Sequence, residues 1–147
     1  MFDFIKRMFG KEPISDSAII HSSKGNYTKK NHLINGGHGQ EAIDYMNNNN
    51  LEYNIVKTYS NGVRVGNVKK HKNKKKRIET NQSWFPKDWS RKDIKKAGQL
   101  VAIGKKYPDG KTKHRKTNKV DVGIIRTYGK IATIFPLSEQ KNKRKRK

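Results

Sequence analysis

Hydrophobic residues are concentrated in a few short segments of the chain, and their spacing predicts the local structure of each segment. In "EAIDYM", Ala42, Ile43 and Met46 recur at helical spacing. Gly39 lies just before the first helical position, and the asparagines at 47–50 provide a stop signal. This segment therefore predicts a short helix between Gly39 and the asparagines.

The segment "LEYNIVKTYSNGVRVGNV", residues 51–68, predicts a β-hairpin. Apolar and polar positions alternate in its first half, as in a strand with one buried face. Asn61-Gly62 tolerates the positive φ of a tight turn, and the apolar positions resume after it with a shift at Gly66. Before the turn, Leu51, Tyr53, Ile55 and Lys57 alternate with polar positions, and after it Val63, Val65 and Val68 continue the return strand.

A capping box predicts the start of a second helix near residue 90. The Ser90 hydroxyl can accept from the backbone of Asp93, and the Asp93 carboxylate can reach back. Ile94, Ala97 and Val101 then form one apolar face. The pattern predicts a helix that packs this face against a sheet.

Both tryptophans lie directly before this helix, in "SWFPKDWS". Pro86 disfavours helix at the residue before it, so Trp84, Phe85 and Trp89 are predicted to lie on a turn that leads into the helix. Large rings can fill the corner between a helix and a sheet. We therefore expect these aromatic residues to be mainly structural.

A second hairpin is predicted over residues 120–136, "VDVGIIRTYGKIATIFP". Its two β-rich runs are joined around Tyr128-Gly129-Lys130, and Pro136 ends the second run. Residues 10–31 and 104–119 are polar and rich in turn-forming residues, so both are predicted to be loops.

The order of these elements predicts an α+β fold, in which short helices are followed by antiparallel β-hairpins packed with a central helix. We expect an N-terminal helix and loop at 1–30, one folded domain at 31–137 and a disordered basic tail at 138–147. The opening "MFDFIKRMFG" predicts a terminal helix that docks on the domain or binds a membrane surface or a partner. Its apolar run is too short for a signal peptide, and no segment is long enough to span a membrane.

Charge indicates the class of partner more clearly than the hydrophobic pattern does. The chain has 35 Lys and Arg against 12 Asp and Glu, for a net charge of +23. Such a balance predicts a polyanionic partner, and the mixture of basic, aromatic and amide residues favours nucleic acid. The absence of cysteine excludes disulfides and thiolate zinc sites.

Two histidines lie in sequences suited to phosphate chemistry. His38 lies in "GGHGQ", where glycines let a phosphate approach the backbone, and His71 lies in the basic run 69–77. One imidazole can take the proton of a ribose 2′-hydroxyl while the other protonates the leaving 5′-oxygen, and a lysine stabilises the transition state. A metal site is less favoured, because no carboxylate near His32 and His38 completes a ligand set.

Four segments together resemble bacterial EndoU-type nuclease domains, which form the C-terminal toxic domains of polymorphic and LXG-type toxins. The segments are "GGHGQEAID", "YSNGVRVGNVKKHKNKKKR", "NQSWFPKDWSRKDIKKAG" and "GKIATIFP". The resemblance implies a small-RNase fold and cleavage of RNA to 2′,3′-cyclic phosphate ends without a metal cofactor, although some relatives respond to manganese.

The resemblance also implies a catalytic centre with two histidines, a lysine and a hydroxyl residue. Carried onto this chain, these are His38, His71, Lys76 and Thr133, with Tyr128 nearby. Lys75 and Lys72 are alternative positions for the lysine, and His32 in "HLING" is an alternative to His38. Residues expected to contact RNA around the site are Lys72, Lys75, Arg77, Gln82 and Trp84.

Three functions therefore remain open from the sequence: an endoribonuclease toxin, a DNase toxin and a nucleic-acid-binding protein without catalysis. The first implies secretion or delivery by a bacterial secretion system, action in the cytoplasm of a target cell, and neutralisation by an acidic immunity protein. The sequence leaves the oligomeric state undetermined.

Overall fold

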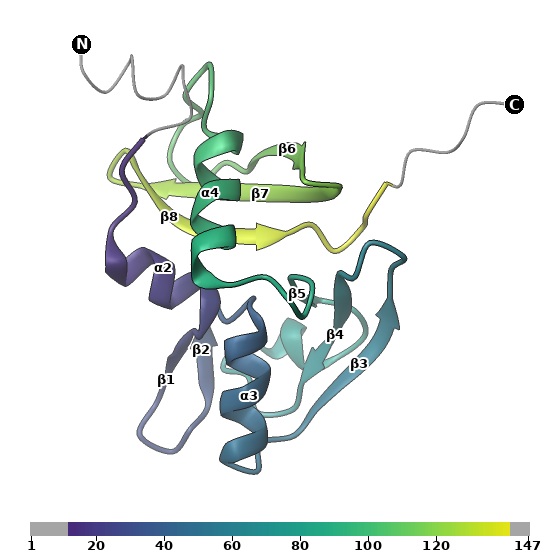
Figure 1. Ribbon diagram of the computed structural model, residues 1–147. Coiled ribbons are helices and arrows are strands. Elements are labelled where there is room, and N and C mark those ends of the chain that lie inside the picture. Colours follow the sequence, from purple (N-terminus) through teal and green to yellow (C-terminus); the bar gives the residue numbers. More distant parts are fainter. Residues whose placement is uncertain (1–11, 142–147) are drawn as a thin grey trace, which may run out of the picture.

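The computed structural model describes residues 12–141, which form helices and small antiparallel sheets and confirm the predicted α+β class (Figure 1). In chain order the elements are α2 (Asp16–Ser23), β1 (Asn26–Tyr27), β2 (Leu33–Asn35), α3 (Gln40–Asn48), β3 (Tyr53–Thr58), β4 (Arg64–Val68), the 3-10 helix η1 (Lys74–Arg77), β5 (Gln82–Trp84), α4 (Arg91–Val101), β6 (Lys113–Thr117), β7 (Val120–Thr127) and β8 (Lys130–Pro136). The strands pair as β1-β2, β3-β4-β5 and β6-β7-β8.

The buried side chains form two hydrophobic clusters. The larger cluster joins α2 and α4 to the β6-β7-β8 sheet, across which α4 lies in Figure 1. The smaller cluster lies around α3, β2 and the β3-β4-β5 sheet. The smaller cluster consists of Leu33, Ala42, Ile43, Met46, Val68 and Trp84.

The two clusters are joined by adjacent residues of the aromatic segment. Trp84 lies in the smaller cluster and Phe85 in the larger one, and neither side chain has exposed surface. Trp89 stacks on Phe85, with ring centroids 4.9 Å apart. Removing a buried ring of this size typically costs about 3–5 kcal/mol of unfolding free energy. The predicted structural role of these rings is confirmed, although Trp84 belongs to strand β5 and not to the turn.

The helices α3 and α4 follow the predicted patterns. Gly39 is the N-cap of α3, and Ala42, Ile43 and Met46 are its buried residues. At α4 the capping box between Ser90 and Asp93 is formed in both directions. The apolar face of α4 is buried against the β6-β7-β8 sheet, as its spacing predicted.

The first predicted hairpin is formed by β3 and β4, but its two strands differ in burial. All residues of β4 are buried, whereas β3 lies at the edge of its sheet and Ile55 is 42% exposed. The alternating positions of β3 therefore do not form a buried face, because no second layer covers this strand in the described part of the chain. A register shift between Ile55 and Lys57 lies opposite Gly66, where the sequence had indicated an irregularity.

Part of the predicted loop at 10–31 is helical instead. Residues 16–23 form α2, which begins where the Ser15 side chain accepts a hydrogen bond from the amide of Ala18. Its sequence, DSAIIHSS, has no strong amphipathic period, which is why the apolar pattern did not reveal it. Tertiary packing against β8 stabilises it.

Part of the predicted loop at 104–119 is a strand. Residues Lys113–Thr117 form β6, which pairs with β7 over five consecutive positions. Its basic side chains are mostly exposed, so the ladder of backbone hydrogen bonds forms without burying charge. The hairpin predicted over residues 120–136 is confirmed, and it is extended to a three-stranded sheet by β6.

The basic segment after β4 contains a short helix, and the start of the tail is more ordered than expected. Residues Lys74–Arg77 form η1. Gln140, in the predicted disordered tail, is buried and bonds to the backbone of Asp121 and Leu137. The terminal helix predicted at the start and the basic run at 142–147 lie outside the described residues.

Candidate active site

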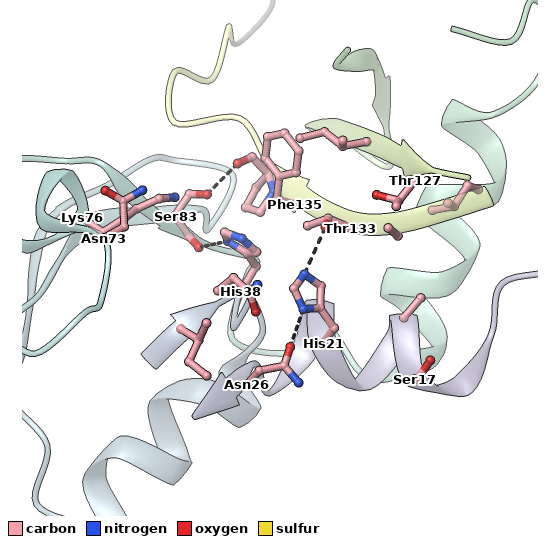
Figure 2. Close-up of a pocket in the computed structure, with 18 of the residues that line it drawn as sticks. Ser17, His21, Asn26, His38, Asn73, Lys76, Ser83, Thr127, Thr133 and Phe135 are labelled. Carbon is pink, nitrogen blue, oxygen red and sulfur yellow. Dashed lines mark hydrogen bonds between the residues drawn. The ribbon is translucent and has the colours of Figure 1, made fainter. Parts of the chain in front are cut away.

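A cavity of about 790 Å³ is lined by side chains from both halves of the described chain (Figure 2). Its walls come from α2, the β2–α3 connection, the basic segment around η1, β5, and the hairpin β7–β8. Five predicted catalytic residues line it: His38, His71, Lys76, Tyr128 and Thr133. The tertiary structure also adds His21, which the sequence analysis did not single out.

The glycine-rich segment places His38 beside the end of α2. The amides of Gly37, His38 and Gly39 donate hydrogen bonds to the carbonyl groups of His21, Ser22 and Ser23, respectively. These carbonyls lie in the last turn of α2, where no helical partner remains for them.

The same geometry explains the glycine that precedes this segment. A Cβ atom at Gly36 would lie 2.0 Å from the carbonyl oxygen of His21, and φ at Gly36 is +70°. The sequence suggested that these glycines let a phosphate approach the backbone. The structure instead explains Gly36 by its contact with α2.

The ring of His38 is oriented by β5. Its Nδ1 lies 2.7 Å from the carbonyl oxygen of Ser83, and because a carbonyl only accepts, Nδ1 carries the proton. Burial and the nearby Lys76 lower the pKa of His38 to about 3, with smaller contributions from the other two histidines of the cavity. His38 is therefore neutral at physiological pH, and Nε2 is the nitrogen that remains for a substrate.

His21 joins the cavity through α2 and β8. Its Nδ1 lies 2.5 Å from Oδ1 of Asn26, and its Nε2 lies 3.0 Å from Oγ1 of Thr133, 112 residues away in sequence (Figure 2). Both partners have an oxygen that can accept, so a protonated ring can keep both hydrogen bonds. No local sequence pattern marks His21, because its place in the cavity depends on helix α2.

His71 has a different hydrogen-bonding environment. Its Nδ1 accepts a hydrogen bond from the backbone amide of Asn73, at 2.9 Å. Burial, Lys76 and Arg77 lower the pKa of His71 to about 4. A proton on Nδ1 would face the Asn73 N–H, so the structure favours the neutral ring.

His71 also organises the basic segment that carries Lys76. The Nε of Arg77 donates to the His71 carbonyl at 2.6 Å, and the amide of Lys76 donates to the Asn73 carbonyl at 2.9 Å. Burial lowers the pKa of Lys76, which lines the cavity. Lys72 and Lys75, the alternatives considered for the catalytic lysine, are exposed and do not line it.

The predicted hydroxyl residues occupy different parts of the cavity. Thr133 lies in β8 against the His21 ring. Tyr128 lies at the β7–β8 turn and is 91% exposed. Ser83, which was not predicted, bonds His38 through its carbonyl and donates its hydroxyl to the Pro136 carbonyl at 2.7 Å (Figure 2). Ser83 therefore connects His38 to β8.

Two residues expected to contact RNA lie in the interior instead. Gln82 and Trp84 have no exposed surface. The side-chain amide of Gln82 donates to the carbonyls of Gly36 and Gly37, so Gln82 fixes the position of the glycine segment. This corrects the expectation of RNA contact for both residues, because a side chain with no exposed surface that does not line the cavity cannot touch a polymer bound there.

The structure also bears on His32, the alternative to His38, and on the presence of a metal site. His32 lies between β1 and β2 and does not line the cavity. Among residues 12–141, no group of three or more His, Cys, Asp or Glu side chains lies close enough to hold a metal ion.

Comparison with known proteins bears out the resemblance seen in the sequence. A family model described as "Bacterial EndoU nuclease" matches residues 15–138. The match begins before residue 31, the expected start of the domain, and so includes α2 and His21. No curated protein and no solved structure matched the chain. No helix within the described residues is long and apolar enough to cross a membrane.

Proposed function

The chain belongs to the bacterial EndoU nuclease family, and on this basis we propose that it is an endoribonuclease whose chemistry needs no metal ion. In the proposed reaction the ribose 2′-hydroxyl attacks the adjacent phosphorus, and the 5′-oxygen of the next nucleotide leaves. A base accepts the 2′ proton, an acid protonates the leaving oxygen, and a cation stabilises the added negative charge. The convergence of histidines and a partly buried lysine on one cavity carries this proposal.

His38 is the proposed base. Its Nδ1 proton is donated to the Ser83 carbonyl, which fixes the ring and leaves the lone pair on Nε2 for the 2′ proton. Burial and Lys76 lower its pKa to about 3, so the basic form is present throughout the physiological range. This low pKa also limits its strength as a base, so the reaction depends on stabilisation of the transition state.

His21 is the proposed acid, in place of the His71 expected from the sequence. The oxygens of Asn26 and Thr133 accept from both of its ring nitrogens when it is protonated. The Nε2 proton of His21, hydrogen-bonded to Thr133 at rest, can then be transferred to the leaving 5′-oxygen. This step yields a 5′-hydroxyl and a 2′,3′-cyclic phosphate. His71 is less suited to this step, because its Nδ1 already accepts the Asn73 amide.

Lys76 is the proposed cation at the transition state, and Thr133 is the residue that positions His21. A partly buried ammonium interacts more strongly with a phosphorane-like dianion than a solvated ammonium does. The exposed Lys72 and Lys75 and the partly buried Arg77 would add attraction to phosphates that does not depend on base sequence. Tyr128, at the exposed β7–β8 turn, is positioned to contact the part of the RNA that leaves the cavity.

Incubation of the purified protein with a 5′-labelled RNA and its all-deoxy counterpart, both in EDTA, tests this function. We expect the RNA to be cut to 2′,3′-cyclic phosphate and 5′-hydroxyl ends, with the DNA intact, because the nucleophile is the 2′-hydroxyl. A His38→Ala variant with an unchanged melting temperature is the matched control.

Three outcomes would contradict the proposal. RNA that is bound but uncut in EDTA would exclude the metal-independent reaction, and addition of manganese or magnesium would then test a metal-dependent one. Cleavage of the DNA would favour a DNase instead. Equal binding of both polymers without cleavage would leave only a basic nucleic-acid-binding protein.

We further propose that this nuclease is a toxin delivered to the cytoplasm of a target cell and neutralised by an acidic immunity protein. A net charge of +23 supports the electrostatic part, because an oppositely charged inhibitor associates faster. Association measured over a range of salt concentrations tests it, and we expect the rate to fall steeply as salt increases. A basic inhibitor, or a salt-independent rate, would contradict the electrostatic account.

A further inference from the structure

The open face of the β6-β7-β8 sheet continues the cavity outwards. Residues directly opposite one another in antiparallel strands have side chains on the same face of the sheet. On β7 and β8, Ile125 is opposite Thr133 and Gly123 is opposite Phe135. Three of these residues line the cavity: Ile125, Thr133 and Phe135. The buried pair Ile124 and Ile134 points to the other face, towards α4.

A single row of residues crosses this face from β8 to β6. Gly123 is opposite Phe135 on one side and His114 on the other. The row therefore begins at Phe135, whose ring centroid lies 5.8 Å from that of His38, and ends at the exposed His114 on the edge strand.

Gly123 leaves the middle of this row without a side chain of its own, and neighbouring side chains occupy that space. A Cβ atom there would lie 2.8 Å from Cζ of Phe135 and 3.1 Å from side-chain atoms of Thr112 and Leu137. The Phe135 ring therefore extends across β7 towards β6 and occupies the space that a side chain at position 123 would fill. His114 follows about one strand spacing, roughly 4.8 Å, farther along the sheet.

The charge around this row suits a single nucleic-acid strand. Lys111 and Lys141 are exposed beside β6, and Lys116 lies on the same face as His114. The acidic residue on this face, Asp121, is paired with Lys116 at 3.1 Å. Proteins bind single strands in this way, with a basic groove for the phosphates and aromatic rings for the bases.

We propose that this face, from Phe135 across Gly123 to His114, is a subsite for a base of the RNA next to the cleaved linkage, and that the His114 ring stacks on that base. The proposal rests on the function proposed above, because its occupant is the RNA strand that leaves the cavity. A strand passing over the Phe135 ring reaches the His114 ring across Gly123, which adds no side chain of its own to the row.

Binding of a fluorescent 2′-O-methyl RNA oligomer to the full chain tests the subsite, because this probe lacks the nucleophile and stays intact. His114→Ala should weaken binding about fivefold, the lower end of a stacking contribution. His114→Phe should restore affinity close to that of the unchanged protein, because stacking needs only an aromatic face. His32→Ala is the matched control, since His32 lies outside the cavity, and it should leave affinity unchanged.

The salt dependence of binding separates stacking from charge. His114→Ala should keep the slope of log affinity against log salt, whereas loss of a phosphate contact would reduce that slope by about one. Unchanged affinity of His114→Ala, or no recovery in His114→Phe, would overturn the subsite. If the probe behaves as expected but the protein leaves ordinary RNA uncut, the subsite stands and the proposed reaction fails.

Discussion

His21 and His71 are two histidines that line the same cavity from different sides. Their hydrogen-bond partners differ. His21 lies between the oxygens of Asn26 and Thr133, which can both accept from a protonated ring. His71 accepts the amide proton of Asn73, which only a neutral Nδ1 can do. The comparison shows that residue type alone does not distinguish two histidines of one cavity, because a protonated His21 can keep both of its hydrogen bonds whereas a protonated Nδ1 of His71 would lose its bond to Asn73.

The largest expected effect comes from removing either proposed proton-transfer group. His38→Ala and His21→Ala should each lower the rate of RNA cleavage by on the order of 10²–10⁴, while affinity for 2′-O-methyl RNA is retained. Single-turnover cleavage rates and binding titrations on the same preparations provide the measurement. If His21→Ala cleaves normally and His71→Ala does not, the two histidines have the reverse of the proposed roles.

Removal of the partly buried cation should have the next largest effect. Lys76→Met should slow cleavage by on the order of 10²–10³, because the transition state loses its nearest positive charge. The exposed neighbour provides the matched control, and Lys75→Met should change the rate much less.

Lys76→Met should also raise the pKa of His38. Lys76 is the second-largest cause, after burial, of the low value of about 3. An NMR titration of the imidazole would detect the shift. An unchanged pKa would place the Lys76 ammonium farther from His38 in solution than in the structure.

His71 should tolerate replacement by a side chain that keeps its acceptor. His71→Ala should slow cleavage roughly tenfold, because the segment that holds Lys76 loses an anchor. His71→Asn should recover most of the rate, because the amide oxygen can accept from the Asn73 N–H much as Nδ1 does. Equal and severe loss in both variants would instead identify His71 as a proton-transfer group.

The smallest effect concerns stability at acid pH. The pKa values of His38 and His71 are lowered to about 3 and about 4, so in mildly acid solution the unfolded chain binds protons that the folded chain excludes. The unfolding free energy should therefore fall as pH decreases from about 6.5 towards 4, by at most about 1.4 kcal/mol per pH unit for each histidine. Urea denaturation across this range measures the slope, which His71→Asn should reduce. A stability independent of pH would contradict the burial of both neutral rings.

Sequence patterns predicted the elements in which local signals and packing agree. The capping box at Ser90 and the apolar spacing of α4 specify one helix, and the alternating residues of β7 and β8 specify one hairpin. The sequence patterns failed for elements that are stabilised mainly by tertiary contacts. Helix α2 has little amphipathic character, and strand β6 is a basic segment ordered by its pairing with β7.

The sequence by itself determined the α+β class, the strongly basic character and the residue types needed for phosphate chemistry, because these follow from composition and short-range periodicity. Only the tertiary structure decided which residues meet. It brings His21 to Thr133 across 112 positions of the chain, and it turns Gln82 and Trp84 inwards to support the site. Hydrogen bonds between distant segments, such as those from the glycine-rich segment to the end of α2, fix these positions, and no local pattern encodes them.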